Sequence, residues 1–201
     1  MPLSTTAEVQ AFLDQLDSVT EDPNTVVTLE LAPVVYEGDL DISGRAVSLT
    51  GSSGEKGSTV IRGCVSIDTR SPLYATFSGI TFEGPGTGIL AAEGFWVKDC
   101  RFDGKDTGIL GLDGSWPIIE FCSFTGCGTG LHFNSSTSTM RNALYQGLSF
   151  INNGTGVLLE RVPGNDTFYF LDCTFEGNGT DIENLSKNEI LYSLDGLDNG
   201  E

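Results

Sequence analysis

The chain is poor in basic residues and in long apolar stretches. Its 201 residues include 10 Lys+Arg against 28 Asp+Glu, which gives a formal net charge of -18 at pH 7. A field of this sign repels nucleic acid and acidic membrane surfaces, so we expect neither as a partner. No stretch resembles a signal peptide or a membrane span. We therefore expect a cytoplasmic protein as the chain is written, or an extracellular one if it is excised from a longer precursor.

Cysteine and histidine are too few and too scattered for a zinc site. The chain has five Cys and one His, and the cysteine spacing differs from that of a metal knuckle. We therefore expect small buried thiols. The length and the even spread of apolar residues indicate a single domain over residues 1–201.

One motif is repeated five times along the chain. The copies read FEGPGTGI, FDGKDTGI, FTGCGTGL, FINNGTGV and FEGNGTDI, and they begin at Phe82, Phe102, Phe124, Phe150 and Phe175. The distances between successive phenylalanines are 20, 22, 26 and 25 residues. Periods of this length are typical of solenoids, in which each coil buries its apolar face on the next.

The composition favours three short strands per coil over a leucine-rich repeat. The segments lack the Leu and Asn spacing of leucine-rich repeats and are rich in Gly, Phe, Thr and Val. Equivalent residues then stack at about 4.8 Å, with phenylalanine inside and threonine at a turn. The position two residues before each Phe, which holds Cys100, Cys122 and Cys173 in three coils, should also point inward. Cys127 falls in a column that we expect to be an exposed turn.

These features resemble the right-handed parallel β-helix of the pectate-lyase-like superfamily. The resemblance covers roughly residues 25–185 and implies an all-β fold, a single-stranded right-handed parallel β-helix of about seven or eight coils. That superfamily includes polysaccharide lyases and glycoside hydrolases. Here RVPG at 161–164 keeps only the start of a lyase Arg-x-Pro pattern, and the Asp-Asp, Gly-His and Arg-x-Lys signatures of polygalacturonases are missing. Whether the chain is an enzyme stays open, and the missing signatures weigh against it.

Both ends of the solenoid are expected to be covered. Residues 1–20 predict a capping helix, because Thr5 and Glu8 have capping-box spacing and an apolar stripe follows at Val9, Phe12, Leu13 and Leu16. Residues 186–201 predict an acidic C-terminal cap or tail over the last strand edges.

A candidate ligand site lies in two coils that continue as EGFW at 93–96 and DGSW at 113–116. Aligned on the preceding threonines, these segments stack Trp96 on Trp116 and Glu93 on Asp113. Two indoles form a flat apolar surface on which a sugar ring can stack, and carboxylates accept hydrogen bonds from sugar hydroxyls. The alternative is that both tryptophans cover a strand edge.

Two further sets of charged residues are weaker candidates. Glu83 and Asp103 directly follow their phenylalanines and could begin a calcium site, or they could be solvated acids. Arg141 and Arg161 lie on lengthened loops and could hold an acidic sugar, or they could form surface ion pairs. His132 shares a column with Leu90, Leu110 and Leu158, so we expect it to be half-buried and structural.

Three functions remain open at this stage. The chain is expected to be a carbohydrate-binding module for an oligo- or polysaccharide, an enzyme acting on a polysaccharide, or a structural module that forms a homo-oligomer. With so few cations, the preferred glycan should be neutral, or acidic with calcium as a bridge. Thr ladders also occur in ice-binding β-helices, but these repeat Thr-x-Thr on a flat face and this chain does not.

Overall fold

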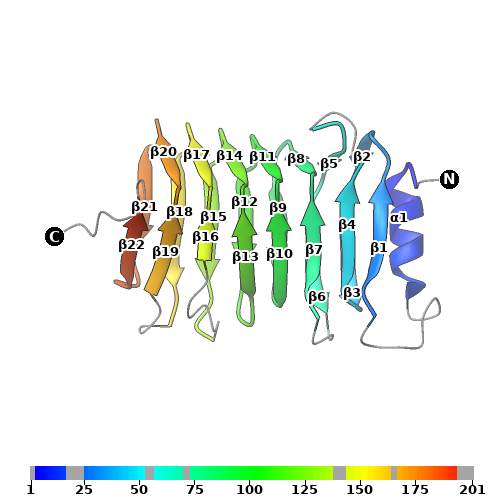
Figure 1. Cartoon of the computed structure of the whole chain (residues 1–201), viewed down its shortest axis with the longest axis horizontal. Helices are drawn as coiled ribbons and strands as arrows, with labels where there is room; N and C mark the ends of the chain where they lie inside the picture. Colours follow the sequence, from blue (N-terminus) through cyan, green and yellow to red (C-terminus); the bar gives the residue numbers. More distant parts are fainter. Residues whose placement is uncertain are drawn as a thin grey trace.

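The computed structural model describes residues 3–16, 25–52, 57–69, 73–137, 144–163 and 167–193. Within them the chain winds into a parallel β-solenoid, with helix α1 (Thr6–Leu13) at its N-terminal end (Figure 1). Each coil places one strand in each of three parallel sheets, and the expected all-β solenoid fold is confirmed. In this part of the chain, no helix combines the length and the apolar character needed to cross a membrane.

Sheet A has eight strands among the described residues, and sheets B and C have seven each. Sheet A contains β1 (Val27–Leu31), β4 (Val47–Gly51), β7 (Ala75–Ser78), β10 (Gly94–Lys98), β13 (Trp116–Glu120), β16 (Leu144–Gln146), β19 (Thr167–Leu171) and β22 (Glu189–Ser193). Sheet B contains β2 (Val35–Glu37), β5 (Val60–Arg62), β8 (Thr81–Glu83), β11 (Arg101–Asp103), β14 (Ser123–Thr125), β17 (Ser149–Ile151) and β20 (Thr174–Glu176). Sheet C contains β3 (Leu40–Gly44), β6 (Val65–Thr69), β9 (Thr87–Ala91), β12 (Thr107–Gly111), β15 (Thr129–Asn134), β18 (Thr155–Arg161) and β21 (Thr180–Asn184).

The repeated phenylalanines form one continuous stack inside the solenoid. Successive rings lie 4.8, 4.7, 5.0 and 4.8 Å apart, in the order Phe82, Phe102, Phe124, Phe150 and Phe175. The first four are completely buried, and Cys100, Cys122 and Cys173 are buried beside them, as expected. All five cysteines are free thiols. The in-register phenylalanine column therefore forms the centre of the core.

Helix α1 covers the N-terminal strand edges with its side chains. The expected capping box is present, since the Thr5 side chain accepts from the Glu8 N–H and the Glu8 carboxylate accepts from the Thr5 N–H. Val9 and Leu13 are buried against the first coil. The Gln10 amide bonds both the N–H and the C=O of Asp41, which satisfies the edge of β3 as a further strand would.

At the C-terminal end the stack continues beyond the expected boundary at residue 185. Strand β22 pairs along its whole length with β19, so residues 189–193 belong to sheet A rather than to a tail. Ile190, in β22, packs partly buried on the core. Residues 194–201 of the expected cap or tail lie outside the described residues.

The corner between sheets B and C corrects one expectation. Cys127 is only 2% exposed, so the prediction that it lies in an exposed turn was wrong. In this column Lys105, Cys127 and Asn153 are buried, and their side chains donate to backbone carbonyl groups, which need polar partners inside the tight corner. Asn153 accepts from the Cys127 N–H at 2.8 Å, and Asn178 accepts from the Asn153 N–H at 2.9 Å.

Lys105 occupies the same inward column and is almost completely buried. Its Nζ donates to the carbonyl oxygens of Gly63 at 3.1 Å and Pro85 at 3.0 Å. Burial lowers the pKa of Lys105, because the ammonium has lost most of its water. The lysine thus links three successive coils from inside the corner.

Candidate functional site

The outer face of sheet A carries both tryptophans, but they do not stack as the sequence alignment predicted. Trp116 lies opposite Gly94, whereas Trp96 lies opposite Ile118. The two indoles are therefore offset by two residues along neighbouring strands, and each is more than one-third exposed. They share one surface as diagonal neighbours.

The offset arises from the corner between sheets C and A. Two residues separate β9 from β10, whereas four separate β12 from β13. The sequence did carry a signal for this, because the repeat lengthens from 20 to 22 residues between Phe82 and Phe124. The predicted alignment counts forward from the repeat threonine of each coil. Counting back from the next repeat phenylalanine instead, Phe102 for Trp96 and Phe124 for Trp116, aligns Trp96 correctly with Ile118.

A third aromatic residue, Tyr74, joins Trp116 across a glycine. The two rings meet edge to face with their centroids 5.9 Å apart. Gly94 lies between them, and a Cβ there would come within 2.5 Å of the Tyr74 ring. The absence of a side chain at Gly94 therefore allows two aromatic side chains from non-adjacent strands to form one platform. Sequence analysis missed Tyr74, although counting back from Phe82 places it in this row.

Trp96 is fixed by a hydrogen bond to an acid on the next strand. Its Nε1 donates to Glu120 Oε2 at 3.1 Å, which holds the indole across the surface of the sheet. Beside the indole is a hollow of about 190 Å³, lined by Thr76, Phe77, Ser78, Trp96 and Lys98. The hollow thus combines one flat aromatic wall with two hydroxyls and one ammonium, and sequence analysis identified only the tryptophan.

Phe121 continues the aromatic surface at the corner between sheets A and B. It is 48% exposed and has φ 53°, a left-handed conformation that bulky residues rarely adopt. The Lys98 ammonium lies 5.9 Å from its ring centroid. Together, Tyr74, Trp96, Trp116 and Phe121 form what we call the aromatic face of sheet A.

Glu93 and Asp113 are not brought together as a stacked pair. Glu93 lies just before β10, and its carbonyl accepts from the Trp116 N–H. The Asp113 carboxylate instead accepts from the Ser136 N–H at 2.7 Å, and this bond, with a contribution from Arg161, lowers the pKa of Asp113. Asp113 thereby fastens the loop that follows β15, which is a structural role.

Of the two arginine candidates, the structure describes Arg161, which bonds the neighbouring strand of sheet C. Arg161 ends β18, and its guanidinium donates to the side chain and the carbonyl of Asn134 on the neighbouring strand. Arg141 lies outside the described residues. His132 is half-buried between Leu110 and Leu158, as expected, and its Nε2 lies 2.7 Å from Glu160 Oε2.

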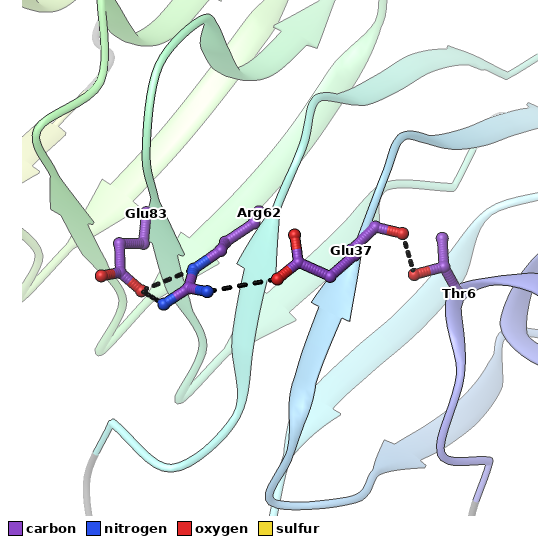
Figure 2. Close-up of polar contacts among 4 residues, drawn as sticks. All are labelled: Thr6, Glu37, Arg62 and Glu83. Atoms are coloured by element: carbon purple, nitrogen blue, oxygen red, sulfur yellow. Dashed lines mark hydrogen bonds and ion pairs between the residues drawn. The ribbon is translucent and has the colours of Figure 1, made fainter.

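Glu83 and Asp103 are neighbours in sheet B, as the repeat predicted. Glu83 is also paired with Arg62, which bridges to Glu37 at 3.2 Å on each side (Figure 2). Burial raises the pKa of Asp103, Arg101 opposes this effect and Glu83 adds to it. Within the described residues, no group of three or more potential metal ligands is found. A calcium site at these two acids stays a prediction, and the ion pair with Arg62 competes with it.

Comparison with known proteins agrees with this architecture. A family model described as "Right handed beta helix region" matches residues 41–193, from β3 to the end of β22. Among curated proteins and among solved structures, no significant match was found. The matched region covers most of the chain and includes the phenylalanine stack and the aromatic face. The chain therefore belongs to the right-handed β-helix family.

Proposed function

We propose that the protein is a carbohydrate-binding β-helix without strong catalytic power, and that it binds its ligand on the aromatic face of sheet A. The β-helix fold supports a carbohydrate-related or a structural module. The observation that carries the proposal is the pair of exposed indoles: Trp96, whose orientation is fixed by Glu120, and Trp116, which packs against the half-buried ring of Tyr74. Fixed aromatic rings are suited to stacking on sugars because little conformational entropy is lost on binding.

The polar groups around these rings fit the hydroxyls of a neutral sugar. Glu120 Oε2 already accepts from Trp96, and its remaining lone pairs can accept from a ligand. The hydroxyls of Thr76 and Ser78 and the ammonium of Lys98 line the adjacent hollow. Each stacked ring contributes roughly 1–2 kcal/mol by apolar burial, so a site with two or three rings has a modest affinity.

The test is a fluorescence titration of the two tryptophans against a panel of neutral oligosaccharides, with and without calcium. We expect quenching and saturation for the parent protein, and at least tenfold weaker binding for Trp116→Ala and for Trp96→Ala, from about 1.4 kcal/mol lost per ring. Gly94→Ala should also weaken binding, because its Cβ displaces the Tyr74 ring from Trp116.

The control is Val35→Ala, which removes a comparably exposed apolar side chain from sheet B. It should leave binding unchanged. Binding that survives both tryptophan substitutions would disprove the proposed site. Efficient depolymerisation of the bound glycan by the parent would place the protein among the enzymes instead.

A further inference from the structure

The exposed aromatic residues of this face follow one line along the strands. Trp116 begins β13, and Phe121 directly follows its last residue. Trp96 lies opposite Ile118, between these two positions. At about 3.3 Å per residue, the three side chains mark a path of roughly 16 Å across sheet A, perpendicular to the stacking direction of the coils. Strands β10 and β13 are neighbours near the middle of the stack (Figure 1).

Beyond the Tyr74–Trp116 pair, the aromatic surface is interrupted along the stacking direction. The outward row that contains Trp96 continues to Thr76 on one side and to Ile118 on the other. The next aromatic residue of this row is Tyr169 on β19, three strands from β10 and therefore about 14 Å away. A ligand that contacts Trp116, Trp96 and Phe121 together thus runs along the strands rather than along the solenoid axis.

Phe121 is the residue that makes this path complete, and its backbone is unusual for its type. The same corner position in the other coils holds Gly79, Asp99, Gly147 and Asp172, and all five residues have φ between 51° and 66°. Glycine and aspartate tolerate the left-handed conformation, whereas a phenylalanine there is strained. The Phe121 ring packs on Gly147 of the next coil but is still 48% exposed, and strain in so exposed a bulky side chain is typical of functional positions.

The corner also presents polar groups at the end of the path. Glu120 precedes Phe121, and the Lys98 ammonium lies on the Phe121 ring at 5.9 Å from its centroid. The ring therefore has a carboxylate and an ammonium beside it, which can bind the hydroxyls of a further sugar unit.

We infer that the ligand is a short linear oligosaccharide lying along the strands, from Trp116 over Trp96 to Phe121, and that Phe121 binds its far end. This inference rests on the proposed carbohydrate site. It requires that affinity rises with ligand length until the path is filled, and that Phe121 contributes only to ligands longer than a disaccharide.

The experiment compares two single variants, Phe121→Ala and Tyr169→Ala, using a disaccharide and a hexasaccharide of the neutral glycan that quenches the parent most strongly. Phe121→Ala should weaken hexasaccharide binding roughly fivefold, as expected for one lost stacking contact, and leave disaccharide binding unchanged. Tyr169→Ala should change neither. The opposite result, with hexasaccharide binding weakened only by Tyr169→Ala, would overturn the inference and place the ligand along the axis.

A third variant, Phe121→Asn, separates binding from folding. Asparagine favours the left-handed conformation, so this variant should melt at or above the temperature of the parent while it loses hexasaccharide affinity. A melting temperature below that of the parent, with hexasaccharide affinity unchanged, would show a structural role and refute the inference. If the parent binds no glycan at all, the proposed function fails, which is a different outcome from glycan binding that ignores Phe121.

Discussion

Removing one ring from the middle of the phenylalanine stack tests how the solenoid is held together. Phe124 is fully buried, and its ring is stacked at 4.7 Å on Phe102 and at 5.0 Å on Phe150. Replacement of a buried phenylalanine by alanine costs about 3–5 kcal/mol, through lost apolar burial and the cavity that remains. The two stacked neighbours place Phe124→Ala near the upper end of this range, because each aromatic contact adds to area burial.

The matched variant is Phe175→Ala, at the C-terminal end of the same stack. Phe175 is only partly buried; it stacks on one ring, Phe150, at 4.8 Å, and meets Phe170 edge to face at 6.1 Å. We expect Phe175→Ala to lower the free energy of unfolding by less than about 3 kcal/mol, because folding buries less apolar area at this position than at Phe124. Urea unfolding, monitored by circular dichroism, measures the loss of unfolding free energy in each variant. Equal losses for the two variants, or a Phe124→Ala protein as stable as the parent, would refute the view of the stack as a continuous core.

Two further predictions concern the cysteines. Cys64 is the one partly exposed thiol of the five, so a thiol reagent should modify one group in native buffer and five in denaturant, and Cys64→Ser should abolish the native reaction. That reaction should be slow, because burial raises the pKa of Cys64. Two or more thiols modified in native buffer would contradict the burial of the others. Burial also raises the pKa of Cys173 from 9.0 to about 11. Between these values the folded state holds a proton that the unfolded state has lost, so the stability contributed by this thiol is present below about pH 9 and is lost as the pH rises towards about 11. The urea midpoint of Cys173→Ala should therefore fall less steeply over that range than the midpoint of the parent, and parallel curves would refute this reasoning.

The sequence alone determined the features of this protein that recur with the repeat. Each coil must bury its apolar face on the next, so residues at a constant offset from the phenylalanines, such as Cys100 and Cys122, form inward ladders. The capping box at Thr5 and Glu8 was predictable for a similar reason, since it depends on local spacing within one helical turn. The ring stack and the N-terminal cap therefore followed from short-range patterns.

Only the tertiary structure decided what happens at the corners and on the outer face. The inward direction of Cys127 and Lys105 depends on how a corner satisfies its backbone groups, and no periodic pattern encodes this. The repeat lengths show two extra residues between Phe102 and Phe124, but only the structure places them at the corner before β13. There they shift every outward position of β13, which separates Trp116 from Trp96 and brings it to Tyr74 across Gly94. A surface is formed by neighbours in space that are distant in sequence, so its composition depends on the register at which coils meet.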